Sequence, residues 1–191
     1  LCKLIIRSDP EKLVLFEANE FALYSIEQQL SKRTDIEIVP VLGSVCDNAL
    51  VRRTLTSQNV DVVFHAAAHK HVPLVEANVL EGIRNNVVGT HTVVQAAFDS
   101  GVQEFVLIST DKSVRPTNVM GATKRWAEFI VHDCAEKARK ADTAQRFCAV
   151  RFGNVLGSNG SVVPLFKQQI SDGGPVTVTD LTMTRYFMSI H

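Results

Sequence analysis

Short apolar runs rich in β-branched residues alternate with amphipathic segments along almost the whole chain. Runs such as 12–17, 61–67 and 104–110 have the length of buried strands, whereas the segments between them carry apolar residues at helical spacing. Strands that alternate with helices in this way form a parallel sheet covered by helices on both faces. We therefore expect an α/β fold, a doubly wound parallel sheet, as a single domain over residues 1–191.

The same patterns predict the individual elements. Strands are expected at 12–17, 36–42, 61–67, 104–110, 146–152 and, briefly, 176–180. Helices are expected at 20–32, 48–57 (capped by Asp47 or Asn48), 122–140 and 162–171, with the tail of another at 1–8 and one long helix from Pro73 to Phe98, which Gly101 ends. The spacing of Trp126, Phe129, Ile130 and Cys134 predicts one buried stripe on the helix at 122–140.

Composition excludes several classes of protein. Among 191 residues, 46% are hydrophobic, which is enough for one core and argues against disorder. Twenty Lys and Arg balance twenty Asp and Glu, so no overall basic field would attract nucleic acid or acidic lipid. Nothing approaches the roughly 20 apolar residues of a membrane-spanning helix. The four cysteines lack zinc-site spacing, which favours a reducing, cytoplasmic compartment and predicts no metal.

Ligands of open α/β sheets gather beyond the carboxyl ends of the strands, so the residues that close each strand are the first candidates for a site. Glu17 ends a strand where dinucleotide folds place an acid against the adenosine ribose, although such a residue is more often a solvated loop residue. The glycine fingerprint that should come about 20 residues earlier is not among the sixteen preceding residues. Either the fold binds no dinucleotide, or a first strand and glycine-rich turn precede Leu1.

The densest group of polar residues is the segment 109–124, STDKSVRPTNVMGATK, which leaves a strand and enters a helix. Asp111 and Lys112 are adjacent ionisable groups suited to acid and base work, provided that burial shifts their pKa values. An exposed turn with a salt-bridged pair is the alternative.

The segment STDKSVRPTNVMGATKR closely resembles the nucleotide-sugar 4,6-dehydratases of the CapD-like branch, which are extended short-chain dehydrogenase/reductases with a Rossmann-like sheet. Similar segments recur in the order of that branch: LFEANEFALY, FHAAAHKHVPLVE, NNVVGTHTVVQAA, VRFGNVLGSNGSVVPLFKQQI and MTRYFMSI. Met120 stands where most extended reductases carry tyrosine, and a thioether can neither give nor take a proton. The long, membrane-anchored members of the branch resemble this chain in carrying Met there.

The resemblance implies roles for the residues of this segment. Asp111 is expected to protonate the leaving C6 hydroxyl, and Lys112 to take the C5 proton, which requires a raised pKa for Asp111 and a lowered one for Lys112. Lys124, on the same helix face as Met120, is expected to hydrogen-bond the nicotinamide ribose, although a Lys in a first helical turn usually faces solvent. Thr110, a water or Asp111 could accept the C4 hydroxyl proton in place of the missing tyrosine.

The resemblance also implies binding residues. NAD, or NADP, is expected to contact Glu17, Asp47, Ala66, Ala67, Asn86 and Lys124, although an N-cap role would explain Asp47 equally well. The nucleotide sugar is expected to contact Lys70, His71, Asn154, Ser161 and Val162, with residues 153–191 contributing to its site; a plain Gly/Ser surface loop is the alternative for the segment after Asn154. His65, His69 and His71 suggest a metal, but no carboxylate or Cys completes a ligand set.

The expected activity is therefore a UDP-N-acetylglucosamine 4,6-dehydratase of glycan biosynthesis. A nucleotide-sugar 4-epimerase and a non-catalytic nucleotide-binding module are the alternatives, and Met120 argues against the epimerase. We further expect that the chain is part of a longer protein that continues beyond both Leu1 and His191. That protein is expected to form homo-oligomers and to be anchored in a bacterial inner membrane, with this domain in the cytoplasm and without membrane contact of its own.

Overall fold

The structure is a computed structural model that describes residues 1–33, 35–156, 162–178, 180, 182, 184 and 186–189. Every strand pair in it is parallel. β1 (Lys12–Glu17) pairs with β2 (Glu37–Leu42), and β3 (Val62–His65), β4 (Glu104–Thr110) and β5 (Arg146–Phe152) form a second sheet in that order. The two short strands β6 (Asn154–Val155) and β7 (Phe187–Met188) form a third. The parallel α/β class predicted from the sequence is confirmed.

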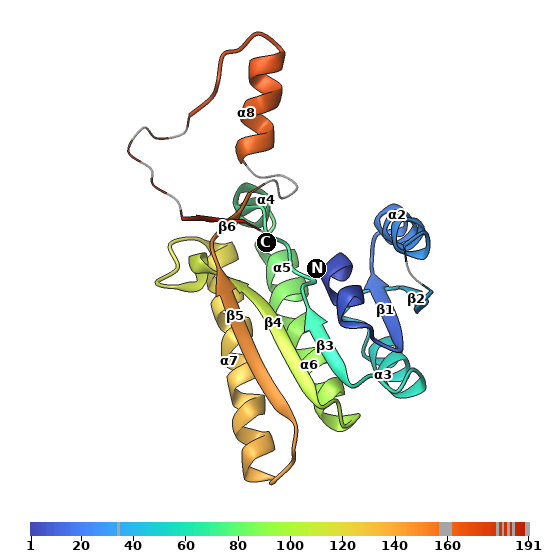
Figure 1. The fold of residues 1–191 in the computed structure, drawn as a ribbon. Coiled ribbons are helices and arrows are strands. Elements are labelled where there is room, and N and C mark those ends of the chain that lie inside the picture. The colour runs from blue at the N-terminus through green and yellow to red at the C-terminus, as the bar shows by residue number, and fades with distance from the viewer. Residues whose placement is uncertain are drawn as a thin grey trace.

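Helices connect these strands. They are α1 (Cys2–Ile5), η1 (Ile6–Ser8), α2 (Glu20–Ser31), α3 (Asn48–Ser57), α4 (Val72–Ala77), α5 (Val79–Ile83), η2 (Arg84–Gly89), α6 (Thr90–Asp99), η3 (Asp111–Ser113), α7 (Val119–Lys140) and α8 (Val162–Ser171). α6 and α7 lie side by side behind β3, β4 and β5 (Figure 1). Phe105, Leu107 and Phe147 of the sheet pack there against Val94, Ala127 and Val131 of the two helices, which makes this layer the main core.

The face of β3–β4–β5 that is turned away from α6 and α7 carries exposed apolar side chains. Phe64 is exposed next to the buried His65 of β3, and Val150 is exposed three residues after the buried Phe147 of β5. Successive side chains of a strand lie on opposite faces of a sheet. Within the described residues, α6 and α7 thus cover one face of this sheet.

Two predicted elements differ in the structure. The single helix expected from Pro73 to Phe98 is broken at Asn78, whose backbone leaves helical geometry while its side chain donates to the carbonyl of Leu74. An amide that satisfies the carbonyls of a last helical turn favours such an end. The strand expected at 176–180 is not formed by its described residues, whereas β6 and β7 were not predicted.

The buried stripe of α7 is also different from the prediction. Trp126 and Phe129 are 56% and 57% exposed, and the guanidinium of Arg125 lies 4.5 Å from the centre of the Phe129 ring. Smaller residues such as Ala127 and Val131 face the sheet instead, with Cys134 buried as predicted. The close approach of α7 to the sheet leaves room for small side chains on the packed face, which apolar spacing alone does not reveal.

The carboxyl ends of β3, β4 and β5 point to one edge, where α4, β6 and the start of α7 also lie (Figure 1). Parallel strands bring their following loops together in this way. None of the described helices is both long and apolar enough to cross a bilayer.

Candidate active site

The turn that follows β4 carries an ion pair, Asp111 and Lys112, at this edge. The hydroxyl of Thr110 caps it by accepting the Lys112 amide at 3.4 Å, and it donates to the Asp111 carboxylate at 3.0 Å. Ser113 is completely buried, and its hydroxyl lies 2.7 Å from the carbonyl of Thr110. The local chain is therefore folded into one tight helical turn, η3, that presents Asp111 and Lys112 together.

Asp111 and Lys112 form an ion pair that reaches a third residue. The Lys112 ammonium donates to Asp111 Oδ1 at 3.1 Å and to Asn154 Oδ1, on β6, at 3.2 Å. Their side chains are 35% and 30% exposed, so neither extends into bulk solvent. Burial alone would raise the pKa of Asp111, but hydrogen bonds from Lys112 and Thr110 outweigh it and hold that pKa below its ordinary value. This direction is opposite to the raised pKa that a proton donor requires.

The start of α7 packs directly on this turn. Asn118 caps the helix by accepting the Gly121 amide, and the Val119 amide donates to the Glu76 carboxylate of α4. A Cβ placed on Gly121 would lie 2.4 Å from the carbonyl oxygen of Lys112. Only a residue without a side chain therefore allows α7 to lie this close to the turn.

Lys124 is the buried cation of the site. Its side chain is 7% exposed, and its ammonium donates to the carbonyl of Ile108 on β4 at 2.5 Å. Burial lowers the pKa of Lys124 to about 8, against a smaller opposing effect of Glu128. This Lys does not face solvent, and its amino group lies under the strand that leads into the Asp111–Lys112 turn.

Met120 and Asn86 are joined through Thr123. Met120 is buried, and its carbonyl accepts the Thr123 hydroxyl at 2.8 Å, while the Asn86 amide donates to that hydroxyl oxygen at 3.0 Å. Asn86 also exchanges two hydrogen bonds with the backbone of His69. It lies in η2, a π-helical turn, and such turns are frequent at functional sites. Asn86 thus ties α7 to the segment after β3.

A carboxylate that the sequence analysis did not single out lies beneath the turn. Glu128 is 7% exposed and accepts hydrogen bonds from Ser109 at 2.6 Å, from Ser113 at 2.7 Å and from two nitrogens of Arg151 at 2.8 and 2.6 Å. Arg125 adds a further bond at 3.0 Å. Burial would raise the pKa of Glu128, but these donors lower it to about 2. The only sequence signal was a Glu at the four-residue spacing after Lys124.

The residues predicted to bind a dinucleotide lie at two different sheets. Glu17 ends β1 and accepts the Asn19 amide at 2.9 Å, and Asp47 caps α3 by accepting the Leu50 amide at 3.0 Å. Ala66 and Ala67 follow β3, where the Ala67 carbonyl accepts from Asn85. The N-cap explanation of Asp47 is therefore realised, and contacts of these residues with a cofactor stay predictions.

The remaining predicted residues surround the site less closely. Lys70 and His71 are exposed, and His71 is the residue before α4. Val162 opens α8, and Ser161 lies outside the described residues. His65 is buried and hydrogen-bonded to Thr90 at 3.0 Å. Across the described part of the chain, no three or more His, Cys, Asp or Glu side chains are grouped so that they could hold a metal ion.

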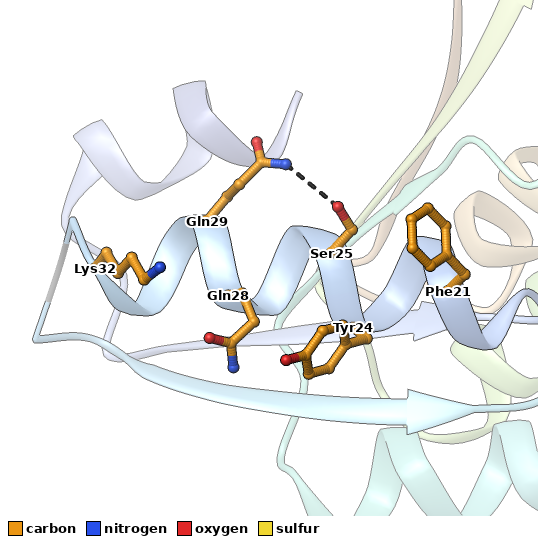
Figure 2. A pocket seen from close by; sticks show the side chains of 6 residues that line it. All are labelled: Phe21, Tyr24, Ser25, Gln28, Gln29 and Lys32. Carbon is orange, nitrogen blue, oxygen red and sulfur yellow. Dashed lines mark hydrogen bonds between the residues drawn. The ribbon is translucent and has the colours of Figure 1, made fainter.

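The hollow drawn in Figure 2 is unrelated to this site. All the residues that line it come from α2 and the position just after it: Phe21, Tyr24, Ser25, Gln28, Gln29 and Lys32. It is an open groove along one helix face and includes none of the predicted site residues. The chemistry of the described residues is concentrated at the turn after β4.

Comparison with known proteins places these residues in context. The model of the family described as polysaccharide biosynthesis protein matches residues 1–191. The capsular polysaccharide biosynthesis protein CapD of Staphylococcus aureus is 50% identical over 192 residues, which are 100% of this chain and 31% of that protein. An X-ray structure of Pen from Bacillus thuringiensis superposes with a TM-score of 0.91 at 34% identity, over 98% of this chain and 56% of the other. The likeness confirms the predicted Rossmann-like fold.

Relatives with two different named activities are also similar. A UDP-N-acetylglucosamine 4,6-dehydratase (inverting) of Campylobacter jejuni is 35% identical over 182 residues, 95% of this chain and 52% of that protein. A UDP-glucose 4-epimerase of Rickettsia canadensis is 44% identical over 131 residues, 69% of this chain and 38% of that protein. The chain thus spans between about a third and a half of the length of these relatives.

Proposed function

We propose that this chain, which belongs to the family of polysaccharide biosynthesis proteins, carries the dehydrating centre of a nucleotide-sugar 4,6-dehydratase. The substrate that we propose is UDP-N-acetylglucosamine. The single observation that carries the proposal is the contact of Lys112 with both Asp111 and Asn154 at the carboxyl edge of the sheet. Elimination of water across C5 and C6 requires one proton acceptor and one proton donor within reach of these two carbons. This turn supplies both.

The Asp111–Lys112 pair can reach its reactive form by moving one proton. In the structure Lys112 is the donor to a carboxylate held below its ordinary pKa. Transfer of that proton along the 3.1 Å hydrogen bond gives a neutral amine and a carboxylic acid, which are the base and the acid that elimination needs. A sugar that excludes water from the pair disfavours its charged form and therefore favours the transfer.

The proton balance of the elimination closes on the same pair. Lys112 takes the C5 proton while Asp111 gives its proton to the departing C6 hydroxyl, which leaves as water. The pair is then an ammonium and a carboxylate again, as in the structure. Asn154 keeps the Lys112 nitrogen in place throughout, because its oxygen accepts from that nitrogen at 3.2 Å.

The reaction also requires a hydride carrier, for which we propose NAD. The chemistry that this group supplies is acceptance of hydride from C4 and its return to C6 at the end of the reaction. The residues present are suited to it, since Glu17 offers a carboxylate to ribose hydroxyls, Ala66 and Ala67 leave space after β3, and Lys124 offers a buried donor. Asn86 fixes the neighbouring backbone at His69. We propose that Asp47 contacts the adenine of NAD.

For the nucleotide sugar we propose Lys70, His71, Asn154, Ser161 and Val162, with 153–191 as the part of this single domain that binds it. The pairing of β6 with β7 supports the last point, because it brings Asn154 and the 187–188 segment together. We further propose that the full-length protein forms homo-oligomers and is anchored in the bacterial inner membrane, with this domain on the cytoplasmic side.

The proposal is tested by proton NMR of UDP-N-acetylglucosamine incubated in heavy water with NAD and the full-length protein. A 4-keto-6-deoxy sugar with deuterium at C5 is expected, and Asp111→Asn and Lys112→Met should each abolish it. The 44% identity with the Rickettsia protein favours a 4-epimerase as the second candidate. A C4-inverted sugar that keeps its C6 hydroxyl would establish the epimerase and overturn the dehydratase.

A further inference from the structure

The buried carboxylate of Glu128 is not used by the proton transfers described above. No hydrogen bond links it to Asp111 or Lys112, yet its partners come from four elements: Ser109 of β4, Ser113 of η3, Arg151 of β5 and Arg125 of its own helix, α7. An ionised carboxylate only accepts hydrogen bonds, so every one of these contacts holds a donor in a fixed direction.

These partners lie on both of the segments that the Lys112–Asn154 contact joins. Ser109 and Arg151 are neighbours in the register of β4 and β5, and both side chains meet Glu128. Ser113 closes the turn that carries Asp111 and Lys112, because its hydroxyl lies 2.7 Å from both the Thr110 carbonyl and the Glu128 carboxylate. Arg151 precedes Asn154 by three residues. One carboxylate therefore holds the strand end that presents Lys112 and the strand end that presents Asn154.

The hydrogen bonds of Glu128 with Arg151 are charge-assisted and bidentate, which makes them strong. Arg151 binds Glu128 with two nitrogens, at 2.8 and 2.6 Å, and bidentate charge-assisted pairs of this type fix geometry as well as adding energy. The side chain of Glu128 is 7% exposed, so little water competes for its oxygens. Loss of the negative charge would leave the Arg151 and Arg125 cations facing a neutral side chain.

We propose that Glu128 is a positioning residue of the dehydrating centre, which holds Lys112 and Asn154 at their mutual distance by clasping the two strand ends that carry them. The inference rests on the proposed function for its effect on turnover. Displacement of a reacting group by about 1 Å can lower a rate by about 100-fold. Glu128 thus acts chiefly on kcat, because Asn154 is the one residue among the five proposed to contact the sugar that it positions.

The test is Glu128→Gln in the full-length protein, with Glu136→Gln as the matched control on the same helix. Glu136 also pairs with an Arg, Arg139, at 2.8 Å, but its side chain is 41% exposed, against 7% for Glu128. With UDP-N-acetylglucosamine and NAD, E128Q should lower kcat by about 10- to 100-fold and change KM by less than about threefold, while E136Q keeps both. A folded E128Q with wild-type kcat overturns the positioning role.

Two further experiments test the inference if E128Q does not fold or if turnover cannot be measured: the variant Ser113→Ala and amide hydrogen exchange. S113A removes only the donor from the turn and should lower kcat by about 3- to 10-fold. Amide exchange of peptides covering 109–116 and 151–156 should become faster in E128Q, or in S113A if E128Q is unfolded, but not in E136Q. Unchanged exchange in both segments overturns the inference. This result is independent of the proposed function, which a missing keto product with the wild type would overturn.

Discussion

Lys112 Nζ lies 3.2 Å from the side-chain oxygen of Asn154, 42 residues further along the chain. An ammonium has three hydrogens to donate, and here two of them are directed at Asn154 and Asp111. The nitrogen that we propose as the C5 base is thereby fixed between η3 and β6 rather than free to rotate on a flexible side chain.

Removal of the Asn154 side chain should show how much the fixed position of the Lys112 nitrogen contributes to turnover. We expect Asn154→Ala to lower kcat for keto-sugar formation by about 10- to 100-fold, because a hydrogen bond to a charged group contributes about 1.5–3 kcal/mol. Asn48→Ala is the matched control, since Asn48 also accepts from a cationic side chain, Arg52, but on α3. Steady-state kinetics of the two variants decide the matter, and equal losses in both would contradict the prediction.

Gly121 should not tolerate even one methyl group. Its added Cβ would lie 2.4 Å from the Lys112 carbonyl, a backbone atom that can move only if the turn or α7 moves. We expect Gly121→Ala to destabilise the protein by about 1–3 kcal/mol and to lower turnover in the folded fraction. Urea unfolding and kcat measurements test both effects. Ala122→Ser, at the next and exposed position, is the control and should leave both unchanged.

Local signals were sufficient to predict most of the fold. β1, β4 and β5 begin and end where their apolar runs do, and Asp47 caps α3 by the side-chain bond that its residue type predicts. Gly101 ends α6 in left-handed backbone, φ 75°, as a glycine after a helix should. These features depend on residues that are neighbours in sequence, so composition and spacing determine them.

Features that depend on distant residues were missed. Glu128 looks like one more charged residue of an amphipathic helix until Ser109 of β4, Ser113 of η3 and Arg151 of β5 are brought to it. Likewise, Trp126 was predicted to be buried, whereas the close packing of α7 on the sheet selects small residues. The turn with Asp111 and Lys112 was located from the sequence, and Asn154 was named as a sugar contact, but only the structure showed that Asn154 contacts Lys112.

Met120 should be replaceable by another apolar residue of similar volume. It is buried, and its thioether can neither give nor take a proton, so we expect Met120→Leu to keep keto-sugar formation within about threefold and stability within about 1.5 kcal/mol. Met120→Ala is the contrasting variant and should cost about 2–5 kcal/mol of stability, because it opens a cavity. A folded M120L that loses more than about 100-fold in rate would show that the sulfur has a direct role.

The pKa of Lys124 predicts a specific dependence of stability on pH. Burial lowers that pKa to about 8 in the folded protein, below its ordinary value of 10.5, so between these two values the unfolded chain binds more protons than the folded one. Stability therefore rises with pH across this window, and the cost of burying the charged ammonium is complete below about pH 8.

Lys124→Met removes the titrating group and keeps most of the side-chain volume, so the difference in unfolding free energy between wild type and variant should shift in favour of the wild type from pH 8 to 10.5. Urea unfolding at several pH values in this window measures that difference. All other ionisable groups are common to both proteins, so their contributions cancel in the difference. Stability curves that stay parallel would mean that the Lys124 ammonium is as well solvated in the folded protein as in the unfolded chain, in spite of its bond to the Ile108 carbonyl.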